Sequence, residues 1–206
     1  MTMLVRIHQV RMDPSNRRNG EEVARDAIVP AARDQKGYRG ALLASNAGGQ
    51  FLLATFWESE EALKASGAGS YYQQQLAKVK DLLSEAPVTS SGEVLTLEPV
   101  SGTPRAMRFT IVPVKTDRAQ EMQTLSADIA AAAKRQPGFA GWIGVRTDND
   151  EAAGISIWDS PESREKSEPA YLKEAMGKVM ALAAGQPRQA VLDVVVCEVP
   201  ATAQAR

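Results

Sequence analysis

Apolar residues follow two patterns along the chain, one typical of strands and one typical of helices. Residues 4–12 and 107–114 are rich in valine, isoleucine and phenylalanine and predict β-strands. Residues 20–36 and 117–136 predict helices. The second of these carries its apolar side chains at helical spacing, at Met122, Leu125, Ile129 and Ala133. Each half of the chain is therefore expected to begin with a strand followed by a helix.

The pattern after each helix predicts a hairpin, an interrupted helix and a closing strand. The hairpin strands are residues 40–46 and 50–58 in the first half and 142–147 and 154–159 in the second. The interruptions fall at Gly67-Ala68-Gly69 and at Glu168-Pro169, because glycine and proline break helices. The closing strands are residues 92–98 and 191–199.

Two short motifs recur at a constant distance. Lys36-Gly37-Tyr38-Arg39-Gly40 returns as Pro137-Gly138-Phe139-Ala140-Gly141, and Trp57-Glu58-Ser59 returns as Trp158-Asp159-Ser160. The differences 138 − 37 and 158 − 57 are both 101, so neither copy has an insertion between its two motifs. An internal repeat of this length indicates two copies of one structural unit.

The repeated order of elements is the split β-α-β order of a ferredoxin-like unit. We therefore expect an α+β fold with two ferredoxin-like units in tandem, residues 1–99 and 107–200, joined by a linker over residues 99–106. One antiparallel sheet with helices on one face leaves its other face bare. The two sheets are thus expected to cover each other, face to face, in an α+β barrel within one chain.

The composition bounds the partners and the compartment. The 24 basic and 25 acidic residues give a net charge of −1 without long runs of one sign, which indicates neither nucleic acid nor a membrane as a partner. No secretory signal or long apolar run is recognisable, which predicts a soluble, cytoplasmic protein. The single cysteine, Cys197, is interpreted as a small core residue.

The motifs together resemble the antibiotic-biosynthesis-monooxygenase family of dimeric α+β-barrel proteins. The shared features are the Gly-aromatic-x-Gly segment, the hairpin, the tryptophan followed by an acid and a serine, and the broken helix bearing a tyrosine. The resemblance implies a cavity between the sheet and the helices of each unit. It places Trp57 with Tyr71 or Tyr72 at the wall of the first cavity, and Trp158 with Tyr171 at the wall of the second.

The family resemblance also implies two kinds of chemistry. Some members oxidise polycyclic phenols to quinones with neither metal nor flavin, and others bind and open haem with a histidine on the second helix. This sequence has no histidine on either second helix, so haem binding or degradation is the weaker alternative. With one histidine, one cysteine and no nucleotide-binding fingerprint, no cofactor is expected.

The candidate catalytic residues are His8, Tyr71 and Tyr72, and the candidate substrate-binding residues are Trp57, Arg6, Trp158 and Tyr171. His8 is the only side chain that titrates near neutrality and is the candidate general base. A tyrosine hydroxyl could orient a phenolic substrate, and Arg6, like Arg108, could pair with an anionic group. For each of these residues packing, an ion pair or an exposed surface position remains the alternative reading.

Two functions follow from these features. One is an oxygenase without a prosthetic group, acting on a small aromatic or polycyclic phenol, and the other is a non-catalytic binder of small apolar molecules. The chain is expected to be a monomeric pseudo-dimer, or a homodimer of it. The first unit is expected to hold the working pocket, because it has His8 where the second has Thr110. Trp142, which replaces Ala41, would fill the second cavity instead.

Overall fold

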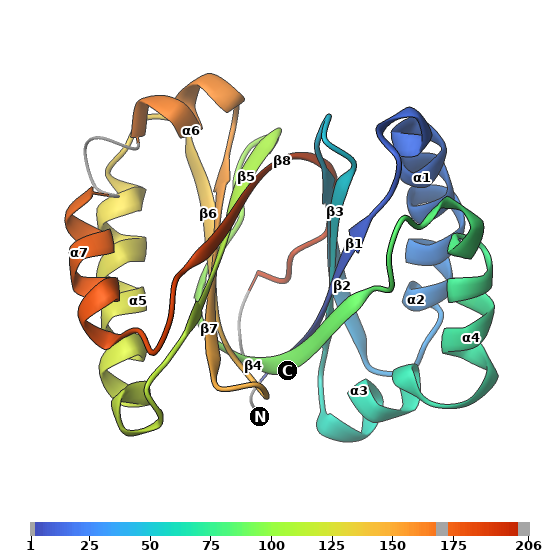
Figure 1. The fold of residues 1–206 in the computed structure, drawn as a ribbon, viewed down its shortest axis with the longest axis horizontal. Helices are drawn as coiled ribbons and strands as arrows, with labels where there is room; N and C mark the ends of the chain where they lie inside the picture. The colour runs from blue at the N-terminus through green and yellow to red at the C-terminus, as the bar shows by residue number, and fades with distance from the viewer. Residues whose placement is uncertain (1–2, 168–172, 202–206) are drawn as a thin grey trace. The chain divides into compact units, whose positions relative to one another are not determined.

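The computed structural model describes residues 3–167 and 173–201, which form strands and helices (Figure 1). The strands of the first half are β1 (Leu4–Arg11), β2 (Tyr38–Ser45), β3 (Gln50–Trp57) and β4 (Val88–Glu98). Its helical segments are the short turn η1 (Pro14–Asn16), α1 (Arg17–Val23), η2 (Ala24–Ile28), α2 (Val29–Arg33), α3 (Glu60–Gly67), α4 (Gly69–Ala77) and η3 (Lys80–Leu82).

The second half has the same order of elements. Its strands are β5 (Ala106–Pro113), β6 (Phe139–Thr147), β7 (Glu151–Trp158) and β8 (Arg188–Cys197), and its helical segments are η4 (Thr116–Arg118), α5 (Ala119–Lys134), α6 (Pro161–Ser167) and α7 (Lys173–Leu182). No helix among the described residues is long and apolar enough to cross a membrane.

The strands are hydrogen-bonded to their neighbours in the order β1-β3-β2-β8-β5-β7-β6-β4, which closes on itself as a barrel. The pairs β1–β3, β2–β3, β5–β7 and β6–β7 are antiparallel. The predicted α+β class and the predicted barrel are therefore confirmed.

Contacts divide the chain into two units whose limits differ from the ranges 1–99 and 107–200. The first unit runs to Ser91 and adds Val194–Pro200, and the second spans Gly92–Asp193. The strands β4 and β8 cross these limits, so each contributes one part to either unit. The closing strand of each half therefore lies partly in the first unit and partly in the second.

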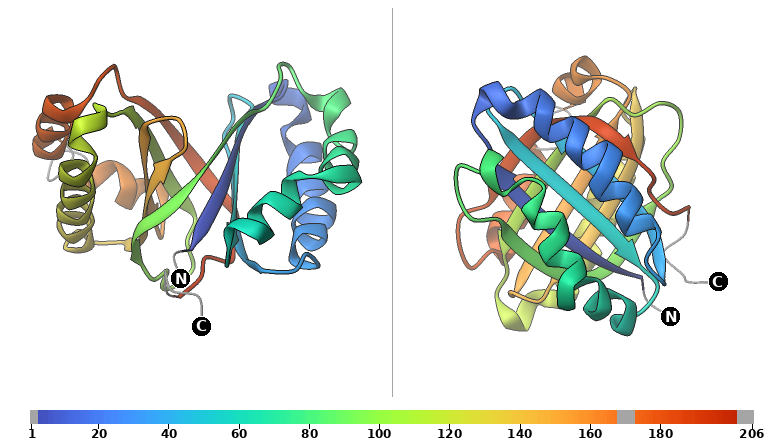
Figure 2. Two further views of the ribbon diagram at one scale, coloured as in Figure 1. Left: turned by 90° about the horizontal axis from the view of Figure 1, so that it is seen from below. Right: turned by 90° about the vertical axis from the view of Figure 1, so that its right-hand side faces the viewer.

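The helices of each unit lie on one face of that unit's strands. In the first unit α2 contacts β2, and α3 contacts β1 and β3; the right-hand view of Figure 2 looks onto these helices, in blue and green, with the strands behind. In the second unit α5 contacts β6 and β7, and α6 contacts β5 and β7. This face of each sheet is where a buried core or cavity can form.

The two repeated motifs meet in space. Tyr38 is paired with Trp57 across β2 and β3, and their rings pack edge to face with centroids 5.9 Å apart. Phe139 and Trp158 repeat this contact at 5.7 Å. Each tryptophan donates its indole N–H to a hydroxyl two residues earlier, Trp57 to Thr55 and Trp158 to Ser156, both at 3.0 Å. Their recurrence in the sequence therefore has a structural cause, an aromatic pair with a satisfied buried N–H.

A serine caps the helix that follows each of these tryptophans, and the helix interruption of the first unit is as predicted. Ser59 accepts the backbone N–H of Ala62 at 3.2 Å, and Ser160 accepts that of Ser163 at 3.1 Å. Ala68 has an extended backbone and separates α3 from α4. The second interruption, at Glu168-Pro169, lies outside the described residues.

One extra residue distinguishes the first helical run from its counterpart. Leu4 and Ala106 pair with the equivalent tryptophans, so β1 and β5 are offset by 102 residues (106 − 4), whereas the later motifs are offset by 101. The first run holds this residue as the π-helical turn η2, in which the Val29 N–H donates to the Ala24 carbonyl, while α5 is uninterrupted. Pro30 lies directly after this turn and lacks an N–H, which favours the wider turn over a regular one.

Substitutions of Gly138 and Gly177 test the backbone conformation assigned to the turn before β6. Gly138 has φ of +79°, and a Cβ there would overlap the Ser163 side chain, whereas Gly177 lies within α7 with open space around it. We expect Gly138→Ala to lower the free energy of unfolding by about 1–3 kcal/mol, and Gly177→Ala to raise it by about 0.5–1 kcal/mol. Urea unfolding measures both. Equal effects from the two substitutions would contradict the assigned turn.

Candidate functional site

Each unit contains a cavity between its strands and its helices, as the family resemblance implied. The first cavity has a volume of about 100 Å³. All candidate residues of the first half contribute to its lining: Arg6, His8, Trp57, Tyr71 and Tyr72. The fold thus brings together side chains from β1, β3 and α4 that are far apart in the sequence.

His8 is held between a hydroxyl and an aromatic ring. Its Nδ1 lies 2.9 Å from Thr89 Oγ1, and its ring stacks on Tyr72 with centroids 5.7 Å apart. Burial, and secondarily the positive charge of Arg6, lowers the pKa of His8 from 6.5 to about 4. At neutral pH the imidazole is uncharged and can accept a proton, but it is a far weaker base than an ordinary histidine.

The guanidinium of Arg6 is hydrogen-bonded to the C-terminal part of α3. Its guanidinium donates to Ser66 Oγ at 2.6 Å and to the Leu63 carbonyl at 2.7 Å, and it lies against Gly67, where the helix ends. Carbonyl groups at a helix C-terminus lack partners within the helix, and a cation stabilises them. Arg6 therefore positions the helix break as well as lining the cavity.

The remaining candidates of the first cavity are largely enclosed. Trp57 is buried, and its indole N–H is already bonded to Thr55. Tyr71 is partly buried, and this burial raises the pKa of its hydroxyl. At neutral pH it is a hydrogen-bonding phenol and not a base.

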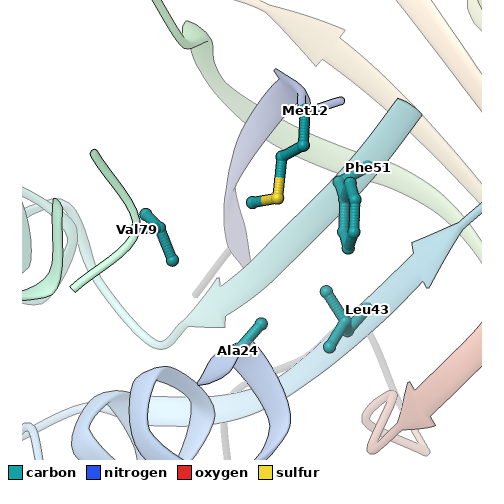
Figure 3. Packing of buried hydrophobic residues seen from close by; sticks show 5 residues of the cluster. All are labelled: Met12, Ala24, Leu43, Phe51 and Val79. Atoms are coloured by element: carbon teal, nitrogen blue, oxygen red, sulfur yellow. The ribbon is translucent and has the colours of Figure 1, made fainter. Parts of the chain in front are cut away.

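Apolar side chains fill most of the space around this first cavity. Figure 3 shows five of them pointing toward one another from the strands, from the helical run and from the segment after α4: Met12, Ala24, Leu43, Phe51 and Val79. All five belong to the same lining as His8. Little room remains for a ligand.

The second cavity is larger, with a volume of about 440 Å³. The difference originates in one row of residues across the sheet. In the first unit His8 faces Leu53, which faces Leu43. In the second unit Thr110 faces Gly154, which faces Gly144. Two leucine side chains are therefore missing from the equivalent row.

A second difference between the units, next to this row, also enlarges the second cavity. Ala152 of β7 has the place that Phe51 has in β3, as the common offset of 101 from the paired tryptophans shows. Both residues line the cavity of their unit. The replacement of phenylalanine by alanine removes another large side chain from the second unit, so the second cavity stays open.

Trp142 lines the second cavity and does not fill it. A Cβ placed on Gly154 would lie 3.0 Å from the indole ring, and one on Gly144 would lie 3.2 Å from the indole nitrogen. The ring thus lies over the backbone that the two glycines leave bare. The larger cavity is in the second unit, whereas the sequence-based prediction assigned the working pocket to the first.

The other candidates of the second half lie elsewhere. Trp158 is fully buried, packs with Ala106 and Ala133, and is not among the described residues that line the second cavity. Tyr171 lies outside the described residues. Arg108, which the sequence paired with Arg6, is buried in the wall of the second cavity.

The sequence analysis did not single out Gly144, Gly154 or Ser126, which line the larger cavity. It ranked the units by titratable side chains and therefore favoured the one with His8. The available signal was Gly144 inside one predicted strand and Gly154 at the start of the next, since glycine in a strand often marks a place where a ligand or another group approaches the backbone. Among the described residues, no group of three or more His, Cys, Asp or Glu side chains is arranged to hold a metal ion.

Comparison with known proteins agrees with this architecture. Residues 3–78 match the family described as antibiotic biosynthesis monooxygenase, which confirms the resemblance found in the sequence. No curated protein matches the chain.

Three solved structures illustrate the likeness in fold. An anthrone oxidase-like protein is 18% identical with a TM-score of 0.75, and the alignment covers 98% of this chain and 97% of that one. A candidate monooxygenase from Fusobacterium nucleatum is 11% identical with a TM-score of 0.75, covering 95% and 93%. The heme-degrading enzyme of Listeria monocytogenes is 12% identical with a TM-score of 0.55, covering 92% and 98%. At these identities the likeness shows the fold alone.

The lowered pKa of His8 makes a prediction about acid stability. The folded state resists protonation down to about pH 4, while the unfolded state takes up a proton near pH 6.5, so protonation favours unfolding between these values. The wild type should lose about 2–3 kcal/mol more than His8→Gln between pH 7 and pH 4.5. Urea unfolding of both proteins at the two pH values measures this difference.

A proton NMR titration provides the direct check. His8 is the single histidine, so its ring signals need no further assignment. A midpoint near pH 6.5 in the folded protein would contradict the buried environment described above.

Proposed function

We propose that this chain, whose residues 3–78 match the antibiotic biosynthesis monooxygenase family, is a monooxygenase that uses neither metal nor flavin and oxidises a small aromatic or polycyclic phenol. We place the substrate in the cavity of the second unit. The observation that carries this assignment is the volume of about 440 Å³, created by the row Thr110, Gly154 and Gly144. Small-molecule sites usually measure about 300–1,000 Å³, a range that the first cavity does not reach.

The lining of the second cavity suits an aromatic ligand. Apolar side chains of β5, β7, α5 and α7 form much of it, including Val112, Ala152, Ile129 and Val179. The buried guanidinium of Arg108 adds a permanent positive charge to the wall. A nearby cation favours the ionised form of a phenol, which is the form that gives up an electron most readily.

The proposed reaction draws its electrons from the substrate. Loss of a proton gives an anion, which passes one electron to dioxygen, and the resulting radical and superoxide combine at a ring carbon. The resulting peroxide anion takes up a proton to give a hydroperoxide, which loses water to leave a carbonyl group. In total one CH₂ group and one O₂ become one C=O group and one H₂O. The protein has to bind the substrate, favour its anion and exclude water.

A second candidate function is binding of a small apolar molecule without turnover. The second unit, Gly92–Asp193, contains neither histidine nor cysteine, so it lacks the side chains that most often transfer protons or act as nucleophiles at neutral pH. Haem is the weakest alternative, since the single histidine lies on β1 of the unit with the small cavity.

An oxidation assay separates the two functions. Purified protein is incubated with 1,8-dihydroxyanthrone in air-saturated buffer, a choice suggested by the anthrone oxidase-like neighbour, and quinone absorbance and oxygen uptake are followed together. We expect quinone formation well above the protein-free rate, with one O₂ consumed per quinone and no loss of rate after treatment with a chelator. Binding without acceleration, here and across a panel of phenols, would favour the non-catalytic function.

Transfer of one side chain between the units tests the location. Ala152→Phe introduces the residue that the first unit has at this place, and it should fill much of the second cavity and reduce turnover at least about tenfold by excluding substrate. Phe51→Leu is the matched control, because it alters only the first cavity and should leave turnover within about twofold of wild type. Thermal melts establish that both variants are folded. The reverse order of effects would move the site to the first unit.

A further inference from the structure

We infer that Trp142 determines the specificity of the second cavity by selecting a flat aromatic ligand that carries an acceptor oxygen. The inference rests on the cavity to which the proposed function assigns the substrate, but it concerns recognition and not oxidation. It assigns to Trp142 a role that the equivalent Ala41 cannot have.

The first observation is the state of the three indole N–H groups. Trp57 donates to Thr55 and Trp158 donates to Ser156, both at 3.0 Å. The Nε1 atom of Trp142 has no hydrogen-bond partner among the residues that the structure describes, although the side chain is only 7% exposed. A buried donor without an acceptor costs free energy, which a ligand oxygen can recover on binding.

The second observation concerns the neighbouring hydroxyl group of Ser126. Ser126 Oγ of α5 also finds no partner within residues 3–167 and 173–201, and it lines the same cavity. A Cβ at Gly144 would touch both this oxygen and the indole nitrogen, so the two groups converge on the space that the glycine leaves. The serine side chain can turn about its Cα–Cβ bond, which opens this space to a ligand atom without backbone movement.

The chemistry of the two groups defines the ligand. An indole N–H donates and cannot accept, and a hydroxyl can donate as well, so the complementary atom is an acceptor such as a carbonyl or phenolate oxygen. The flat indole over Gly154 and the missing side chains of the glycine row favour a planar ring system beside it. The first unit has no equivalent, since Ala41 and Leu43 have the places of Trp142 and Gly144.

The test compares two tricyclic probes of nearly equal shape, fluorenone with a carbonyl oxygen and fluorene without one. Binding is measured in dioxygen-free buffer, where the CH₂ group of fluorene cannot be oxidised to the carbonyl group of fluorenone, so the outcome is independent of turnover. We expect wild type to prefer fluorenone by about tenfold, the ratio that one hydrogen bond supplies. Trp142→Phe keeps a ring but removes the N–H, and it should abolish the preference while leaving fluorene affinity within about twofold.

Trp158→Phe is the matched control, because it removes an indole N–H that already has an acceptor and does not line the cavity. It should retain the preference for fluorenone. In ¹H–¹⁵N spectra, fluorenone should move the indole signal that Trp142→Phe deletes. An unchanged preference in Trp142→Phe, no preference in wild type, or a shift of another indole signal would each overturn the inference. If fluorenone binds as expected but phenols are not oxidised, the proposed function fails and this inference stands.

Discussion

The edge-to-face contact between a strand-end tryptophan and the aromatic residue of the Gly-aromatic-x-Gly turn fixes the register on which the rest of each unit depends. Trp57 and Tyr38 are directly paired, as are Trp158 and Phe139. Side chains alternate between the faces of a strand, so a slip of one residue would exchange the helix-facing set for the opposite set. With the register held at the tryptophan, the residues four positions earlier, Leu53 and Gly154, face the helices in both units.

This common frame lets the two cavities differ without altering the fold. Backbone hydrogen bonds hold the ladder whatever the side chain, so glycine at Gly144 and Gly154 removes volume at the cost of some strand preference. The second unit offsets part of that loss by placing the Trp142 ring over the bare backbone. The first unit keeps leucine and phenylalanine at these places and is correspondingly well packed.

The architecture could be predicted from the sequence because its signals are local and repeated. Hydrophobic periodicity predicted the strands, glycine and proline marked the helix interruptions, and the constant offset of the two motifs indicated a second copy. The π-turn could not be predicted, because the change of offset from 101 to 102 becomes visible only when strand pairing identifies Leu4 with Ala106. The difference in volume between the two cavities could not be predicted in this way. Chemistry-bearing residues such as His8 are visible in a sequence, whereas a cavity is made by side chains that are missing, and its volume depends on neighbours from several elements. The low pKa of His8 likewise depends on burial and on Arg6, which only the packed structure reveals.

The exchange of β4 and β8 between the units has a consequence for the order in which the protein can fold during synthesis. Strand β2 lies next to β8, and the Glu198 N–H donates to the Ala41 carbonyl at 2.7 Å, so the first unit includes a segment near the end of the chain. On the ribosome the N-terminal half emerges first, and until Val194–Pro200 has been made one edge of β2 has no neighbour. An open strand edge can pair with other chains. The interval between the emergence of β2 and that of β8 is therefore a period in which a nascent chain depends on being kept apart from its neighbours.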